Sequence, residues 1–229
     1  LIATQLDDRL MLGQVLHNRA YALVQIGALS EAIAVYTQAE VLFLEVDAGV
    51  ELARLYINLS NLLGLLNRYT EARSIQDKAE HQLRHLEGLE QARHQLALQR
   101  TRFYLQSNTP VDQALLDALT QAQLAFALHG PILEEGLALV LLGHCYITRN
   151  DWTTARQQFE AAYKLVEQGA DRALGYRALF GLGEVEQHQN QFEKAIRYYE
   201  AAIQQIESIR YELQIETFRA DFLTDKLEV

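Results

Sequence analysis

Apolar side chains recur at helical spacing along nearly the whole chain. In one stretch, Phe159, Tyr163 and Val166 follow one another at intervals of four and three residues, the spacing of one face of an α-helix. Short turns separate such stretches, and several carry Gly or Asn, which readily adopt the left-handed conformation just past a helix C-terminus. The pattern therefore predicts an all-α chain of consecutive helices joined by short turns.

A repeat organises these helices. A small residue recurs at intervals of 40 to 42 residues: Ala32, Ala72, Ala114, Ala155 and Ala195. Five residues earlier stands a turn residue: Gly27, Asn67, Asn150 and Asn190, with Asn108 one place off in the third unit. A second series marks the other end of each unit: Gly49, Gly88, Gly130 and Gly169. Hydroxyls are expected to cap second helices at Ser30, Thr70 and Thr109. Each repeat thus contains two residues that end a helix, and therefore two helices. This predicts five helical hairpins, over 8–47, 48–87, 88–129, 130–168 and 170–208.

The repeated residues resemble the tetratricopeptide repeat, whose pattern is a bulky residue, Leu-Gly and Tyr, then Ala, an aromatic residue and Ala. The fourth unit reads Leu139, Leu142, Gly143, Tyr146, Ala155, Phe159 and Ala162. The fifth reads Leu179, Leu182, Gly183, Ala195, Tyr199 and Ala202, with Glu186 replacing an aromatic residue. The first matches through Leu16, Ala20, Ala32, Tyr36 and Ala39. The second matches through Tyr56, Ser60, Leu63, Ala72 and Ala79, with Gln76 in place of the aromatic residue. The third, around Arg102 and Ala118, matches poorly and is assigned by register.

This resemblance implies a right-handed α-solenoid of about five hairpins plus a C-terminal helix. Small residues such as Gly143 are expected to face alanines such as Ala155, and rings such as Phe159 to fill the gap to the next hairpin. The repeat exceeds the basic length of about 34 residues, which is typical of the long-repeat branch found in multidomain signalling proteins. An ordinary helical bundle is the alternative, but its hairpins would not share a register.

The two ends depart from the repeat. Residues 1–7 are expected to be the tail of a preceding helix, 8–208 the repeat array, and 209–229 a C-terminal helix that caps the last hairpin or links it onward. The chain begins at Leu1 and not at Met, so we expect a piece of a longer protein. The sequence of residues 206–226 resembles the linker between tetratricopeptide arrays and CHAT domains, which are caspase-like peptidases with a His–Cys dyad. That resemblance implies an attached C-terminal effector domain whose catalytic residues lie outside this chain.

Charge and composition limit the classes of partner that the chain is expected to bind. The net charge is −10 and there are four lysines, so clustered cations for nucleic acid or an anionic membrane are not expected. No run of 18 or more apolar residues offers a membrane span. The single cysteine, Cys145, cannot form an intrachain disulfide and suits a reducing, cytoplasmic compartment.

Reactive groups are sparse. His144 and Cys145 are adjacent, but neighbours on a helix do not face each other, so Cys145 is expected to pack inside as a small apolar group. His81 and His85 have metal-ligand spacing without a convincing carboxylate on the same face, which favours a solvated polar surface. The sequence therefore predicts no catalytic residue, no metal site and no cofactor.

The tetratricopeptide resemblance implies that the first helices line a concave face. Register places these residues there: His17, Tyr21, Arg54, Asn58, Asn61, Gln99, Phe103, Val140, His144, Arg177, Phe180 and Glu184. None is lysine, so the family's lysine-rich carboxylate clamp is not evident. The predicted peptide-binding positions among them are Tyr21, Arg54, Asn58, Asn61, Phe103, His144, Arg177 and Glu184.

This mixed lining favours an extended peptide or a partner helix, so the sequence predicts a protein-interaction scaffold. Several alternatives stay open. The inner surface is either solvated or covered by another part of the same protein, or the chain is the regulatory arm of a CHAT-type cysteine peptidase. A further alternative is the inducer-sensing segment of a bacterial transcription regulator.

Overall fold

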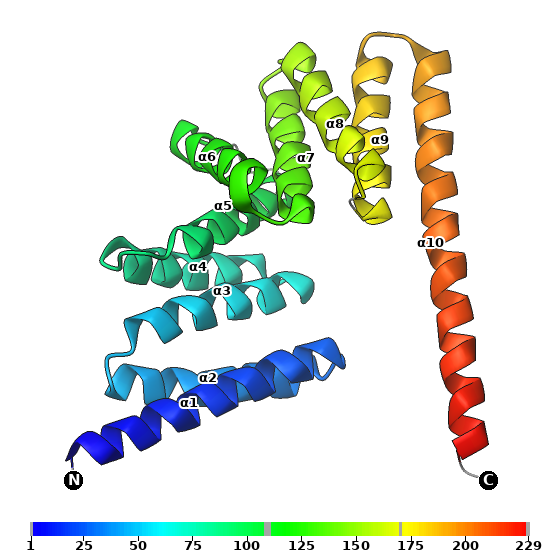
Figure 1. Cartoon of the computed structure of the whole chain (residues 1–229). Helices are drawn as coiled ribbons and strands as arrows, with labels where there is room; N and C mark the ends of the chain where they lie inside the picture. The colour runs from blue at the N-terminus through cyan, green and yellow to red at the C-terminus, as the bar shows by residue number, and fades with distance from the viewer. Residues whose placement is uncertain (1, 108–110, 170, 228–229) are drawn as a thin grey trace. The chain divides into compact units, whose positions relative to one another are not determined.

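The computed structural model describes the backbone of residues 2–107, 111–169 and 171–227 and the side chains of 8–107, 111–169 and 171–212. It divides into two compact units, Leu1–Ala118 and Leu119–Val229. Within these described ranges every regular element is an α-helix, as Figure 1 shows, which confirms the all-α fold class.

The helices follow one another in pairs. The first unit contains α1 (Ile2–Gln25), α2 (Leu29–Glu45), α3 (Gly49–Leu65), α4 (Tyr69–Arg84), α5 (Glu90–Gln106) and the start of α6 (Gln113–His129). The second contains the rest of α6, then α7 (Ile132–Thr148), α8 (Trp152–Glu167), α9 (Arg172–His188) and α10 (Phe192–Leu227). Hairpin contacts join α1 to α2, α3 to α4, α7 to α8 and α9 to α10. The expectation of two helices in each repeat is confirmed.

Left-handed residues end the helices mostly where the sequence predicted. The φ angle is 77° at Gly27, 57° at Asn67 and 59° at both Asn150 and Asn190. In the second series, Gly88 and Gly169 also have positive φ.

Two glycines of the second series have other roles than ending a helix. Asp47, with φ 52°, takes the turn position expected for Gly49, which instead opens α3. Gly130 is not among the described glycines with positive φ, and an added Cβ there would lie 2.6 Å from the Phe126 Cα. The requirement at Gly130 is therefore space against α6.

The predicted hydroxyl caps are wrong where the structure describes them. Ser30 and Thr70 lie inside the first turns of α2 and α4, whose N-cap residues are Ala28 and Arg68. Both helices begin two residues earlier than these caps required. Before α2, the Ala28 N–H donates to the Leu23 carbonyl at 2.9 Å and the helix restarts at once. Thr109 lies outside the described residues.

Aspartates cap two helices of unit 2, α8 and α9. Asp151 accepts a hydrogen bond from the Thr154 N–H at the start of α8, at 3.1 Å. Asp171 accepts from the Ala173 N–H at the start of α9, at 2.7 Å. A short acidic side chain at this position satisfies a backbone donor that the helix leaves unpaired.

The Phe159 ring lies at the centre of the core of unit 2. It is 0% exposed, and an added Cβ at Gly143 on α7 would lie 2.5 Å from its Cε1 atom. An added Cβ at Gly181 on α9 would lie 2.4 Å from the same atom. The ring on α8 is thus held between glycines of the two neighbouring helices. The partner predicted for Gly143 was Ala155, but the ring one turn further along α8 fills the space that Gly143 leaves.

The ends of the chain are continuous with their neighbouring helices. Residues 2–7 form the first turns of α1, so no separate helix ends there. Residues 209–227 continue α10, the orange-to-red helix of Figure 1, in the same direction. A straight continuation cannot fold back over the flank of its own helix, and Ile196 and Ile203 are 55% and 57% exposed. This geometry does not fit the capping role expected for residues 209–229.

Candidate functional site

The first helices of successive repeats lie next to one another within each unit. In unit 1, α3 contacts both α1 and α5, and in unit 2, α7 contacts α9. Polar side chains join them at a spacing of one repeat. Asn58 and His17 Nε2 lie 2.9 Å apart, and Arg102 donates to Asn61 Oδ1 at 2.7 Å. Ser60 donates to Gln99 Oε1 at 2.9 Å. Four of the predicted inner positions, His17, Asn58, Asn61 and Gln99, therefore take part in contacts between neighbouring first helices of unit 1.

A hollow of about 320 Å³ opens on this face between α1 and α3. This α1/α3 hollow is lined by Gln14, His17, Asn18, Tyr21, Glu51, Arg54 and Asn58. It brings together three of the predicted peptide-binding residues: Tyr21, Arg54 and Asn58. The amides of Gln14 and Asn18 and the carboxylate of Glu51 complete a polar lining that the sequence prediction had not included.

The electrostatics of the α1/α3 hollow leave a guanidinium available. Arg54 is exposed and makes no salt bridge among the described residues, whereas Glu51 accepts from Gln14 at 3.3 Å. Burial lowers the pKa of His17, and the nearby Arg54 charge lowers it further. His17 is therefore neutral near pH 7 and holds Asn58 in place without adding charge. Tyr21 is 53% exposed at the rim, where an aromatic ring can cover a ligand.

Of the five predicted inner positions on α7 and α9 in unit 2, four are at least partly exposed. His144 Nδ1 lies 3.6 Å from Glu184 Oε2 across the two helices. Phe180 is 49% exposed and its ring centroid lies 5.4 Å from that of Tyr199. Arg177 is exposed, one turn of α9 from Phe180. These residues form a second surface, in unit 2, that combines polar, ionisable and aromatic side chains.

Burial favours the neutral forms of both His144 and Glu184. Desolvation lowers the pKa of His144 to about 4 and raises the pKa of Glu184. An unfolded histidine titrates near pH 6.5, so between pH 4 and 6.5 the unfolded chain binds a proton that the folded chain does not. The contribution of neutral His144 to the free energy of unfolding is therefore fully present above pH 6.5. It is lost as the pH falls from 6.5 towards 4.

Replacing His144 with glutamine is expected to reduce the fall in the free energy of unfolding between pH 7 and pH 4.5. The wild-type slope from this residue is at most about 1.4 kcal/mol per pH unit. Glu184 works in the opposite direction, since its stabilising protonated form is lost as the pH rises through its raised pKa. Urea unfolding followed by Trp152 fluorescence checks this, with the exposed His129→Gln as control. An unchanged slope in His144→Gln, or an equal change in the control, contradicts it.

Two inward predictions are wrong. Phe103 is 1% exposed, and Val140 is 5% exposed. The Phe103 ring fills space at Gly64, where an added Cβ would lie 2.3 Å from its Cζ atom. Its neighbour Arg102 reaches the inner face instead, through Asn61. The sequence signal for this shift was the poor match of the third repeat.

The reactive groups singled out from the sequence have no shared site. Cys145 is 0% exposed, and burial raises the pKa of its thiol to about 12, so it packs inside as expected. The His81 and His85 rings lie 5.6 Å apart at the surface of α4. Among the described residues, no group of three or more His, Cys, Asp or Glu side chains is placed to hold a metal ion.

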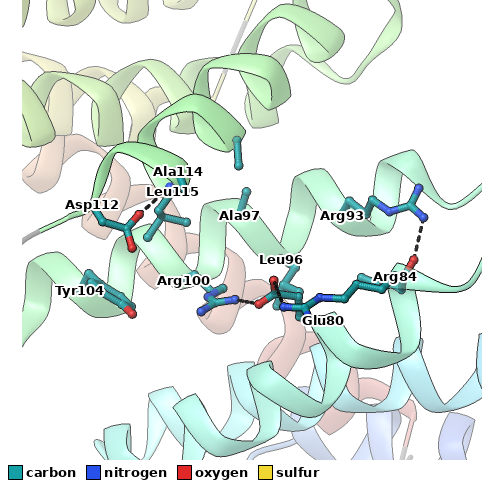
Figure 2. Close-up of a pocket in the computed structure, with 12 residues that line it drawn as sticks. Glu80, Arg84, Arg93, Leu96, Ala97, Arg100, Tyr104, Asp112, Ala114 and Leu115 are labelled. Carbon is teal, nitrogen blue, oxygen red and sulfur yellow. Dashed lines mark hydrogen bonds and ion pairs between the residues drawn. The ribbon is translucent and has the colours of Figure 1, made fainter.

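Figure 2 shows a second hollow, of about 370 Å³, between α4, α5 and the start of α6. This α4/α5 hollow is lined by Glu80, Leu83, Arg84, Arg93, Leu96, Ala97, Arg100, Tyr104, Asp112, Ala114, Leu115 and Ala118. Ala118 occupies the register of Phe159, so the aromatic ring that fills the core of the fourth repeat is missing here.

The arginines of the α4/α5 hollow already have partners. Arg100 forms ion pairs with Glu80 and, at 3.5 Å, with Asp77. Arg93 donates to the Leu83 carbonyl at 2.6 Å and so satisfies the C-terminal end of α4. These contacts make the α4/α5 hollow a weaker candidate for a charged ligand than the α1/α3 hollow.

Comparisons with known proteins identify the repeats. Two family models described as tetratricopeptide repeat match residues 53–80 and 134–208. No curated protein sequence matches the chain. Among the described residues, no helix combines the length and apolar character needed to cross a bilayer.

Solved structures share the fold at low identity. A Signal Transduction ATPase with Numerous Domains from Pyrococcus horikoshii, which has a tetratricopeptide repeat sensor, matches 88% of this chain with a TM-score of 0.69 and 18% identity. The match covers 30% of that protein's length. BtubC from P. vanneervenii gives a TM-score of 0.62 at 18% identity, over 90% of this chain and 92% of its own. YrrB, a TPR protein with an unusual peptide-binding site, gives 0.54 at 20% identity, over 88% and 90%. Residues 53–80 and 134–208 of this chain are therefore tetratricopeptide repeats, as the sequence pattern predicted.

Proposed function

We propose that this chain binds an extended segment of a partner protein on the inner face of its first helices. Tetratricopeptide repeats are protein-interaction scaffolds, and the finer assignment rests on the α1/α3 hollow. There an available guanidinium, several amides and an exposed aromatic ring converge on about 320 Å³. The solved structure of YrrB, with its peptide-binding site on the same fold, supports this proposal.

The lining suits the chemistry of an extended peptide. A peptide backbone offers both donors and acceptors, and side-chain amides such as those of Gln14 and Asn18 can pair with either. Arg54 can form a bidentate pair with a carboxylate, either an acidic side chain or a chain terminus. Tyr21 adds aromatic surface at little cost in conformational entropy.

We further propose that the chain is a non-catalytic sensing segment of a larger cytoplasmic protein. The Pyrococcus horikoshii ATPase carries its tetratricopeptide repeats as a sensor, and this chain corresponds to 30% of that protein. The resemblance of residues 206–226 to a linker before a CHAT domain fits the same role. In this proposal, partner binding is the input to an attached effector domain.

The double variant Arg54→Ala/Asn58→Ala is expected to weaken peptide binding more than tenfold, a loss of about 1.4 kcal/mol or more. Peptides of about 12 residues are selected from a random phage-displayed library against the wild-type chain, and their Kd is measured by fluorescence polarisation. Such a length spans roughly 40 Å when extended. Circular dichroism confirms that helicity is unchanged.

The matched control is Lys164→Ala/Lys194→Ala, which removes two exposed cations from the second helices α8 and α10. Its binding should stay within twofold of wild type. If the lysine variant loses binding and the inner-face variant keeps it, the binding surface is not the inner face. If no peptide is selected at all, the proposal of extended-peptide binding fails.

A further inference from the structure

One flank of α10 exposes a row of large apolar side chains. The exposed fractions are 58% for Phe192, 55% for Ile196, 57% for Ile203 and 42% for Ile206. The row follows one side of the helix at helical spacing. Large apolar side chains arranged in this way mark an interaction surface more often than scattered single residues do.

The corresponding flank of α8 shows what such a row contacts. One repeat earlier, Phe192 and Ile196 correspond to Trp152 and Arg156. Trp152 stacks on His188 of α9 with ring centroids 3.7 Å apart. Arg156 donates to Glu186 of α9 at 2.5 Å. This flank of a second helix therefore receives the first helix of the next repeat, and α10 has no such helix on it among the described residues.

The opposite flank is exposed on α1, the first helix of the first repeat. In the repeat register, Leu174 and Ala178 of α9 correspond to Met11 and Val15 of α1. Leu174 and Ala178 are 1% and 0% exposed, in the apolar cluster that joins α9 to α8. Met11 and Val15 are 63% and 57% exposed, and no helix covers this flank among the described residues.

The two exposed flanks match in chemistry. Arg156 donates to Glu186 of α9 at 2.5 Å and to Gln189, the residue that follows α9, at 3.0 Å. In the same register, Ile196 of α10 would meet Leu23 of α1 and Ile26, the residue that follows α1, so an apolar contact replaces each polar one. Ile26 is 77% exposed, and Leu23 is partly buried.

An apolar contact of this kind already exists inside the chain. At the junction of α2 and α3, the corresponding residues are Ile33, Leu63 and Leu66. All three belong to the apolar cluster of unit 1. The pairing of Ile196 with Leu23 and Ile26 would therefore repeat a junction that the fold already uses.

We propose that copies of this chain associate end to end, with α1 of one copy packed on α10 of the next. The contact continues the packing between repeats and is separate from the inner face that binds the partner in the proposed function. It is heterologous, because the two surfaces differ, so an open assembly keeps one free surface at each end. The mass is therefore expected to rise with concentration.

Sedimentation velocity on the whole chain tests this, using Ile196→Glu to block the α10 flank and Ile26→Glu to block the α1 flank. The wild type is expected to increase in average mass as its concentration rises. Each variant alone should be monomeric, since every copy lacks the same half of the contact. An equimolar mixture should form 1:1 dimers and stop there, because only one complementary pair of surfaces remains.

The control is Leu65→Glu, which charges an apolar residue that is 59% exposed on α3, away from both flanks. It should associate as the wild type does, and circular dichroism should show equal helicity in all variants. A wild type that is monomeric at every concentration overturns the proposal, as does a mixture that stays monomeric. If Ile26→Glu alone still dimerises, α10 pairs with α10 and the proposed contact is wrong.

Discussion

Replacing Phe159 with alanine is expected to lower the free energy of unfolding of unit 2 by about 3–5 kcal/mol. The ring is 0% exposed and lies between Gly143 on α7 and Gly181 on α9. Neither glycine has a side chain that could move into the space, so the cavity would persist. The chain has one tryptophan, Trp152, and it lies on α8, so its fluorescence during urea unfolding reports on this unit.

Phe180→Ala is the matched control, because it removes the same ring from a position that is 49% exposed. Its cost should be about 1 kcal/mol or less, since an exposed ring loses little burial. Equal losses in the two variants would show that Phe159 is not the centre of the packing between repeats.

Replacing Arg156 with leucine is expected to cost about 3–5 kcal/mol, because it leaves the Glu186 carboxylate buried without its cation. The Glu186 side chain is 3% exposed, and one of its oxygens already has no partner among the described residues. The double variant Arg156→Leu/Glu186→Leu should recover most of this loss, because it removes the buried charge as well. Urea unfolding followed by Trp152 fluorescence measures both.

An exposed pair in the same unit provides the control. Arg172 pairs with Glu212 between α9 and α10, and the two side chains are 57% and 56% exposed. Arg172→Leu should therefore cost about 1 kcal/mol or less. If Arg156→Leu is no more damaging than Arg172→Leu, or if the double variant is as unstable as the single one, Glu186 does not depend on Arg156.

The repeat and its helices could be predicted from the sequence because both depend on short-range signals. Apolar spacing, turn residues and the recurring alanines all act within one hairpin, and each appears several times. Gly27 and Asn67 adopt the expected left-handed conformation for this reason. The predicted caps were wrong because a turn that is two residues shorter places the hydroxyl inside the helix, and apolar spacing does not locate a helix start that closely.

The inner face could be predicted only in part. Asn58 and Arg54 lie where register placed them, because α3 follows the repeat pattern closely. Phe103 does not lie where register placed it. Gly64 on α3 leaves space that the Phe103 ring fills, and the neighbouring Arg102 reaches the inner face instead. Such an exchange depends on the partner across the interface, which lies about one repeat away in the sequence.

Glu186 is a second case that required the structure. It occupies a position at which the family pattern has an aromatic residue. From the sequence alone, this glutamate is therefore interpreted as a mismatch of the fifth repeat to the pattern. The structure places it against Arg156 of α8, 30 residues earlier, so an ion pair occupies the place of the aromatic residue. Pairs of this kind are invisible to a search that treats each repeat alone.

The most direct test of the central claim is site-specific photo-crosslinking to a selected peptide. A benzophenone amino acid at Tyr21, on the rim of the α1/α3 hollow, should crosslink to the peptide. The same group at Lys164, exposed on α8, should not. Crosslinking at position 164 without crosslinking at position 21 would contradict the assignment of the inner face as the binding surface.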